Sequence, residues 1–273
     1  MTIKVSRVIR YVVAIVLALL NVAPIYWIII TSFKSYREAF QIPPIFFKWI
    51  NFQSYQGYFA QDGLMNSLAN SVLSTSLSVL VAMLFGCFAA YALSRTRLRG
   101  GEFIAFFMMA TRFIPPISTV IPLFLAMRYF SLYDTVTGLV ILLAAMNIPY
   151  AVWMMRGFFK EVPIEVEEAA WVDGCSRLGG FFRIVLPMCK PGLAATAVLT
   201  TLFAWNDFMY ALIMTSSEAR TLPMTISMFM GDQGVEWNQM AAASTVIMLP
   251  ALVFSIFVQR HMARGLTFGA LKG

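Results

Sequence analysis

The chain has 273 residues, of which 60% are hydrophobic and 12% are charged. A soluble domain usually carries about 25% charged residues, so this composition favours a protein whose solvent is the lipid bilayer and excludes an ordinary soluble fold. The net charge is +7, but the Lys and Arg residues lie between apolar runs. Charges in such positions set membrane topology, and they argue against a nucleic-acid partner.

Six apolar runs are long enough to cross a bilayer, which takes about 20 residues as a helix. Continuous apolarity favours helices over a barrel, because lipid offers no partner to an unpaired backbone group. We therefore expect an all-α polytopic protein with a single membrane domain over residues 1–273. Its six transmembrane helices are predicted at about residues 8–31, 66–94, 102–127, 135–156, 193–215 and 241–261.

Four prolines lie inside the third and fourth predicted spans. Proline is tolerated in a membrane helix where neighbouring groups satisfy the freed carbonyls, so we expect both runs to cross the membrane. These prolines are Pro115, Pro116, Pro122 and Pro149.

The distribution of Lys and Arg predicts the orientation. With the N-terminus in the cytoplasm, the inner segments carry three, three, five and three of these residues, which makes fourteen. The outer segments carry five, and Arg112 lies inside a span. Because cytoplasmic loops are enriched in Lys and Arg, both termini are expected in the cytoplasm.

A few polar and aromatic side chains interrupt the predicted spans. Arg112 lies about 15 Å and Asp207 about 21 Å from the cytoplasmic ends of their spans, at 1.5 Å per residue. An arginine at the centre of a membrane helix costs roughly 2.5–3.5 kcal/mol, so such residues usually face the bundle interior or a watery cavity. Two interpretations stay open: the residues line a translocation path, or Arg112 and Asp207 form a structural ion pair. The candidate path residues are Arg112, Asn147, Trp205, Asn206 and Asp207.

The predicted cytoplasmic loop 157–191 contains a short helix, expected over Pro163–Asp173. Proline suits the first helical position, acidic residues suit the first turns, and Gly174 suits the stop. Ser176 is placed to cap a second short helix, which Pro187 ends.

The acidic residues of this helix indicate whether it contacts lipid or a partner protein. A helix resting on lipid prefers Lys and Arg on its polar face. This helix instead carries Glu165, Glu167 and Glu168, and Ala169 and Ala170 make one side flat. It therefore fits a basic-rimmed groove in a partner protein better than a lipid surface.

The same loop carries an extended motif. Glu168-Ala169-Ala170, Gly174 and Ile184-Val185-Leu186-Pro187 match the signature E-A-A-x3-G-x9-I-x-L-P at every spacing. The chain thereby resembles the membrane subunits of bacterial ATP-binding-cassette (ABC) importers, which implies the type I, MetI-like permease fold. In that family this loop is the coupling helix, which sits in a cleft of the nucleotide-binding subunit. The resemblance assigns ATPase coupling to Glu168, Ala169, Ala170, Asp173, Gly174 and Pro187.

Further motifs resemble the carbohydrate-uptake branch of that family, in particular its maltose-type G subunits. They are Trp205-Asn206-Asp207-Phe208, Glu236-Trp237-Asn238 and the end of the predicted cytoplasmic tail 262–273. In that branch the tail reaches the interface of the ATPase dimer, and the sugar is held largely by the partner membrane subunit. The resemblance therefore implies ATPase contacts from Gly269, Leu271, Lys272 and Gly273.

The partners follow from the same resemblance. It implies a second, homologous permease subunit, two nucleotide-binding ATPase subunits, an extracytoplasmic solute-binding protein and the lipid of a bacterial inner membrane. No cofactor is expected on this chain, because ATP and Mg²⁺ belong to the ATPase subunits. The transported solute is expected to be a sugar, polyol, sugar acid or oligosaccharide. An ABC importer for a non-sugar solute and a proton-coupled secondary carrier are the alternatives.

The residues themselves weigh against other classes. The phosphate-cradling pattern G-x-x-x-x-G-K-[ST] is absent, so the chain is not its own ATPase. No nucleophile–base set is visible, and three cysteines and one histidine do not form a cluster with metal-ligand spacing. A proton-coupled carrier often places carboxylates in several spans, whereas Asp207 is nearly alone here.

Overall fold

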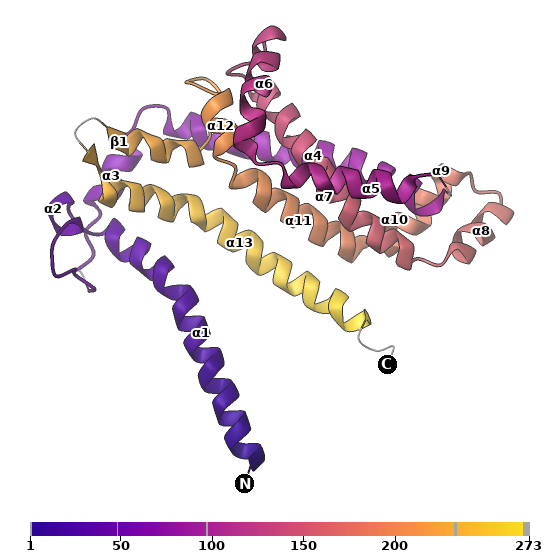
Figure 1. Ribbon diagram of the computed structural model, residues 1–273, viewed down its shortest axis with the longest axis horizontal. Coiled ribbons are helices and arrows are strands. Elements are labelled where there is room, and N and C mark those ends of the chain that lie inside the picture. Colours follow the sequence, from indigo (N-terminus) through magenta and orange to yellow (C-terminus); the bar gives the residue numbers. More distant parts are fainter. Residues whose placement is uncertain (1, 48, 97, 232–233, 270–273) are drawn as a thin grey trace. The chain divides into compact units, whose positions relative to one another are not determined.

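The structure is a computed structural model that describes residues 2–47, 49–96, 98–231 and 234–269, with side chains from Val8 to Ile256 within those ranges. It is almost entirely helical (Figure 1). The α-helices are α1 (Thr2–Ser32), α2 (Tyr36–Ala39), α3 (Gln53–Phe59), α4 (Leu64–Arg95), α5 (Gly101–Ala110), α6 (Pro116–Tyr129), α7 (Val136–Glu161), α8 (Ile164–Val172), α9 (Arg177–Gly180), α10 (Leu186–Met188), α11 (Lys190–Trp205), α12 (Met209–Met214) and α13 (Trp237–Gly269).

Short irregular elements join these helices. Two 3-10 turns are η1 (Thr111–Phe113) and η3 (Pro223–Phe229), and η2 (Phe181–Val185) is a π-helical turn. The strands β1 (Met230–Gly231) and β2 (Gly234–Val235) form a small antiparallel hairpin.

Four helices are individually long and apolar enough to cross a membrane: Val8–Ser32 within α1, α4, α7 and Trp237–Ile256 within α13. They overlap the predicted first, second, fourth and sixth spans. Large apolar side chains on them are exposed in the isolated chain; Leu19, for example, is 64% exposed. Such apolar side chains suit contact with lipid or with another membrane subunit. The helical backbone itself needs no further partner in lipid, because its hydrogen bonds are made within the helix.

The predicted third span is not one continuous helix. It is divided into α5 with η1 and then α6, with a bend of 95° between them. Ile114 and Pro115 both have extended backbone at the break. A residue that precedes proline is pushed out of the α region, and here two residues in succession precede one. The expectation that these prolines are simply tolerated is therefore wrong for Pro115–Pro116, although Pro122 and Pro149 do lie inside helices.

The predicted fifth span is also divided. Helix α11 ends at Trp205, and the short α12 begins only at Met209. At its other end, α11 is bent by 79° from the preceding helical segment Arg177–Met188. The break after Trp205 falls on Asn206 and Asp207, whose short polar side chains compete for backbone hydrogen bonds and so favour helix ends.

The chain divides into two compact units, residues 1–64 with 225–249 and residues 65–224 with 250–273. In the first unit, the buried Tyr58 of α3 shares a hydrogen bond of 3.0 Å with Thr225 and packs against Phe229. Lys34 is buried, and its Nζ lies 4.0 Å from the ring centroid of Trp27. Aromatic packing therefore ties the segment after α1 to the segment before α13.

In the second unit, α7 is the central helix and packs against α5, α11 and α12. It also meets α4 very closely, because a Cβ placed on Gly86 would lie 2.6 Å from the Cβ of Ala151. Only glycine permits that approach. This packing positions both the loop that follows α7 and the cavity described below.

Candidate functional site

The loop after α7 contains the expected helix, α8, which begins after Pro163 and ends before Asp173. Gly174 has φ +89°, a left-handed conformation that favours glycine. The backbone N–H of Gly174 donates to the carbonyl of Trp171 at 3.1 Å, and the N–H of Cys175 donates to that of Ala170 at 2.9 Å. These two bonds form a Schellman stop, so the predicted role of Gly174 in ending the helix is confirmed.

Ser176 caps a second short helix, as the sequence predicts. Its Oγ accepts from the backbone N–H of Gly179 at 3.0 Å, at the start of α9. Pro187 does not itself end that helix. The helix α9 continues through η2 into α10, which includes Pro187 and ends one residue later, at Met188.

A buried ion pair fixes α8 to α4. Glu167 is fully buried, and its Oε1 accepts from Arg95 Nε at 2.5 Å. Its other oxygen, Oε2, accepts from the Tyr91 hydroxyl at 2.7 Å. Arg95 also donates from Nη2 to the carbonyl of Val162 at 2.9 Å, just before α8. Both partners of the pair are thus hydrogen-bonded further, which is the condition for a buried ion pair to be tolerated.

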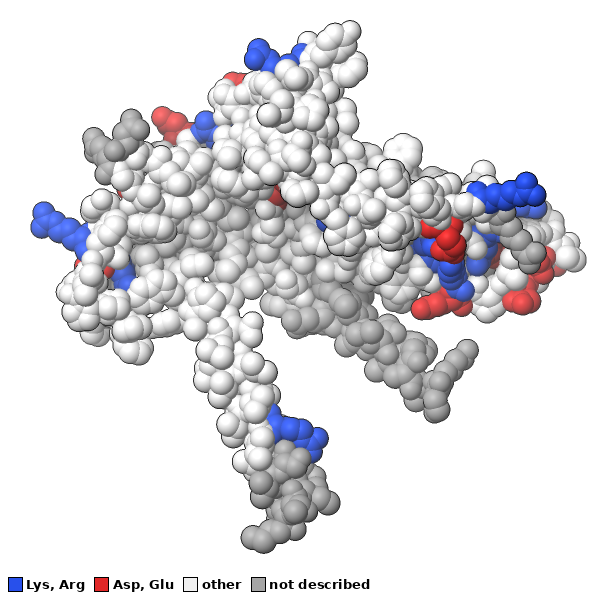
Figure 2. Space-filling view, viewed as in Figure 1, with Lys and Arg blue, Asp and Glu red and all other residues white. Residues whose placement is uncertain are grey.

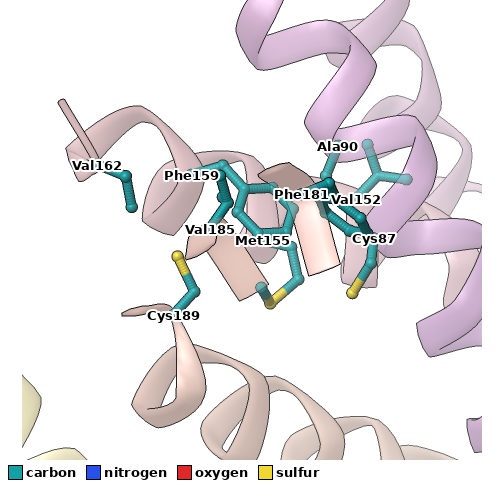
Figure 3. Packing of buried hydrophobic residues seen from close by; sticks show 9 residues of the cluster. All are labelled: Cys87, Ala90, Val152, Met155, Phe159, Val162, Phe181, Val185 and Cys189. Atoms are coloured by element: carbon teal, nitrogen blue, oxygen red, sulfur yellow. The ribbon is translucent and has the colours of Figure 1, made fainter. Parts of the chain in front are cut away.

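Beneath the loop lies an apolar cluster that joins α4, α7, η2 and the start of α11 (Figure 3). Met155, Phe159 and Val185 are completely buried in it. The rings of Tyr91 and Phe181 lie 4.6 Å apart, which extends the cluster to the residues around Glu167. The loop is therefore packed against α4 and α7 through this cluster.

The structure divides the residues predicted for ATPase coupling. Ala170 is buried within its own chain, whereas the others are exposed; these are Glu168, Ala169, Asp173, Gly174 and Pro187. Figure 2 shows Lys, Arg, Asp and Glu gathered at the end of the second unit that carries α8 and α9. In the predicted tail, Gly269 is the last residue of α13, and Leu271, Lys272 and Gly273 lie outside the described residues.

A cavity of about 600 Å³ lies in the second unit, at the breaks in the predicted third and fifth spans. Its wall comes from the break between η1 and α6, the middle of α7, and the break between α11 and α12. Of the predicted path residues it includes Arg112, Asn147, Asn206 and Asp207. Trp205 is buried and lines a separate small pocket instead.

Arg112 is held by α7 and α11. Its Nη1 donates to the carbonyl of Met146 at 2.8 Å and to Asn147 Oδ1 at 3.2 Å. Its guanidinium carbon lies 4.9 Å from the ring centroid of Phe203, within the range of a cation–π contact. Asn147 in turn donates to the carbonyl of Leu143 at 2.9 Å. Backbone, amide and aromatic groups thus hold this cation.

Asp207 is oriented by the backbone that follows it. Its Oδ2 accepts from the N–H of Ala211 at 3.1 Å in the first turn of α12, and Asn206 donates to the carbonyl of Leu202 at 2.8 Å. Although both side chains are among the described residues, Arg112 and Asp207 do not form an ion pair. The ion-pair interpretation is therefore wrong, and the two residues instead line the same cavity.

Sequence reasoning missed the role of Glu167, which it grouped with the acidic surface of the helix. A signal was present: Glu167 lies three residues before Ala170, which is buried, so both are on the face of α8 that turns inward. A carboxylate on such a face predicts a cationic partner, although the sequence does not say which cation.

It also missed Asp134, which lies in the turn between α6 and α7 and has φ +53°. Its carboxylate accepts the backbone N–H groups of four successive residues, Ser216 to Ala219, at 2.8–3.3 Å. Burial by itself would raise the pKa of Asp134, but these donors outweigh it and hold the pKa below its usual value. The carboxylate thereby fixes the loop after α12.

Long apolar helices, two helix breaks around a polar cavity and a firmly anchored loop define an integral membrane permease. The chain belongs to the family of binding-protein-dependent transport system inner membrane components, whose model matches residues 82–268. That match covers the anchored loop and the whole cavity. The chain is therefore an inner-membrane permease subunit of an ABC importer.

Individual relatives agree with this assignment. The chain is 33% identical over 256 residues to the trehalose transport system permease protein SugB of Mycobacterium tuberculosis, with 92% of each chain covered. It is 32% identical over 271 residues to the diacetylchitobiose uptake system permease protein DasC of Streptomyces coelicolor, with 98% of each covered.

A solved structure shares the fold. A chain of a bacterial ABC transporter involved in the import of the acidic polysaccharide alginate superposes with a TM-score of 0.76 at 24% identity. The match covers 94% of this chain and 96% of that one. It confirms the expected ABC importer permease fold.

Proposed function

We propose that this chain is one permease of an ATP-driven carbohydrate importer, and that α8 transmits the ATPase cycle to its spans. The single observation that carries the proposal is the division of α8 into two faces. One face is bound to α4 by the ion pair between Glu167 and Arg95, in which Arg95 Nη2 lies 2.5 Å from Glu167 Oε1. The other, with Glu168 and Ala169, is exposed together with the adjoining Asp173 and can enter a groove of a partner.

The rest of the assembly follows from this role. A second, homologous permease subunit would complete the translocation path, and two ATPase subunits would bind ATP and Mg²⁺. A solute-binding protein would deliver the carbohydrate on the other side of the membrane. The names of the relatives, which transport trehalose and diacetylchitobiose, support a carbohydrate as the cargo.

We also propose that the chain forms one membrane domain of six spans, two of them broken, with both termini in the cytoplasm. The excess of Lys and Arg on the side of α8 supports this orientation. The cavity around Arg112 and Asp207 then lies within the membrane, where polar residues mark a solute pathway.

Charge reversal on the exposed face of α8 tests the proposal. In proteoliposomes that contain the complete transporter, we expect Glu168→Lys to lower ATP-dependent uptake at least about tenfold, or about 1.4 kcal/mol of coupling. Membrane insertion should be unchanged, because the side chain of Glu168 is exposed. Glu161→Lys is the matched control, since Glu161 is exposed at the end of α7 and precedes α8. Normal uptake by the Glu168→Lys transporter would reject the coupling role.

A further inference from the structure

The segment 41–52, which joins α2 to α3, carries an apolar surface that the proposed function does not use. Its described residues form no helix or strand, and large apolar side chains project from it without cover. Four of these side chains are 68–92% exposed in this chain: Ile42, Phe47, Trp49 and Ile50. An exposed apolar patch of this kind marks a surface that contacts a membrane or another protein.

Contacts with α1 fix the height of this segment along that helix. The hydroxyl of Tyr26 donates to the carbonyl of Phe46 at 2.5 Å, and the rings of Phe46 and Trp27 pack edge to face with centroids 5.6 Å apart. Tyr26 lies six residues before the end of α1 at Ser32, which is about 9 Å at 1.5 Å per residue. The segment therefore folds back beside the end of α1 instead of extending away from it (Figure 1).

The apolar run of α1 relates this contact to the bilayer. No charged residue lies between Arg10 and Lys34 in the sequence. A hydrocarbon core about 30 Å thick takes about 20 helical residues, so a core that begins after Arg10 ends near Ile30. Tyr26 then lies about 6 Å inside that boundary. Its hydroxyl satisfies the carbonyl of Phe46, as a backbone group at that depth requires.

The composition of the segment favours lipid over a protein surface. Between Phe40 and Phe52 the sequence has one charged residue, Lys48, and no acidic one. Anionic headgroups attract a lysine and would repel a carboxylate. Tryptophan is enriched at the membrane–water interface, which suits Trp27 and Trp49. Irregular backbone that is exposed to lipid does not cross the hydrocarbon core, so the segment is limited to the edge of that core.

We infer that the segment 41–52 is an interfacial anchor, whose four exposed apolar side chains insert into the headgroup region of the bilayer beside the end of α1. The occupant of this surface is phospholipid. The anchor fixes how deeply α1 sits, because interfacial aromatic and basic residues set the position and tilt of a membrane helix. The orientation in the proposed function puts the anchor in the extracytoplasmic leaflet, and the inference rests on the proposed function for that leaflet alone.

Spin-label accessibility, measured by power-saturation electron paramagnetic resonance, tests the anchor. The complete transporter is placed in nanodiscs of phosphatidylethanolamine and phosphatidylglycerol. The amino acid p-acetylphenylalanine replaces one residue at a time and carries the nitroxide on its ketone, so the native cysteines stay unlabelled. Oxygen concentrates in the bilayer and a nickel chelate stays in water, so the ratio of the two accessibilities reports depth.

Two positions in the segment are labelled, Phe47 and Ile42. Both side chains are exposed, so either replacement should leave the fold intact, and the second keeps the test valid if the first variant fails to assemble. Leu19, which is 64% exposed on α1, is the reference within the hydrocarbon, and the exposed Asp62 is the reference in water. We expect the oxygen-to-nickel ratio at both test positions to exceed the ratio at Asp62 and to stay below the ratio at Leu19.

A ratio as low as that at Asp62 for both test positions would show that the segment stands in water, and it would overturn the inference. Protection from both reagents would also overturn it, because another subunit would then cover the surface. Protection that appears only after the solute-binding protein is added would assign the surface to that protein instead of lipid.

ATP-dependent uptake is measured on the same preparations. A transporter that couples ATP hydrolysis to uptake but carries water-exposed labels in the segment rejects the anchor alone. Loss of coupling in the unmodified transporter would reject the proposed function instead.

Discussion

Charged residues are handled differently in two regions of this permease. Beneath α8, Arg95 and Glu167 lie in direct contact, and the carboxylate is completely buried. In the cavity at the two helix breaks, Arg112 and Asp207 are not paired with each other, and backbone, amide and aromatic groups hold them separately. The first arrangement fixes one piece of the protein to another. The second leaves both side chains lining a cavity of about 600 Å³.

The largest effect is expected from breaking the ion pair. Glu167→Ala leaves the guanidinium of Arg95, whose side chain is only 12% exposed, without its carboxylate, and loss of one partner of a buried ion pair typically costs roughly 3–5 kcal/mol. We expect a clearly lower melting temperature of the purified permease and a loss of ATP-dependent uptake, measured by thermal denaturation and in proteoliposomes.

Glu165→Ala is the control for that experiment, because Glu165 lies on the same helix but is exposed. It should behave like the unmodified protein. If Glu167→Ala and Glu165→Ala were equally harmless, the pair would not anchor the loop, and the contrast between the two regions would disappear.

An intermediate effect is expected in the cavity. Arg112→Met removes the hydrogen bonds to Met146 and Asn147 but leaves no unpaired charge behind, so it should destabilise the protein less than Glu167→Ala. Uptake should fall about tenfold while the transporter still assembles. In a double-mutant cycle with Asp207→Asn, the two changes should add to within about 0.5 kcal/mol in unfolding free energy. A coupling of more than about 1 kcal/mol would indicate an ion pair after all.

The smallest effect on stability is expected from Asp134, whose carboxylate accepts hydrogen bonds from backbone N–H groups. Because the folded protein lowers the pKa of this carboxyl, its contribution to stability is present above the ordinary Asp value of about 3.9 and is lost as the pH falls through the folded value. We expect the protection factors of the amides of Ser216–Ala219, which are their exchange rates relative to an unfolded chain at the same pH, to be high and constant from pH 8 to pH 5 and to fall only below about pH 4.

Asp134→Asn should exchange faster at all these pH values, because its amide lacks the charge that attracts four donors. The exposed Asp62→Asn is the comparison variant. An acceleration that begins near neutral pH would show that another group controls the loop.

Much of the fold could be predicted from the sequence because hydropathy and helix caps act locally. The four continuous spans, helix α8 and its stop at Gly174 all follow from such signals. The breaks at Pro115 and Asp207 could not be predicted as firmly, because a proline or an aspartate in a span can be tolerated or can end the helix, depending on its neighbours. The role of Glu167 could not be predicted either, because it depends on a distant part of the chain: its partner Arg95 is 72 residues away.

The close contact between Gly86 and Ala151 has a mechanical consequence. Helices that touch almost backbone to backbone cannot slide past each other without separating, because packed interiors do not deform continuously. The pair α4–α7 should therefore move as one rigid rod when α8 is displaced. Any bending of this chain would then fall on the two breaks, the Ile114–Pro115 step and the residues after Trp205.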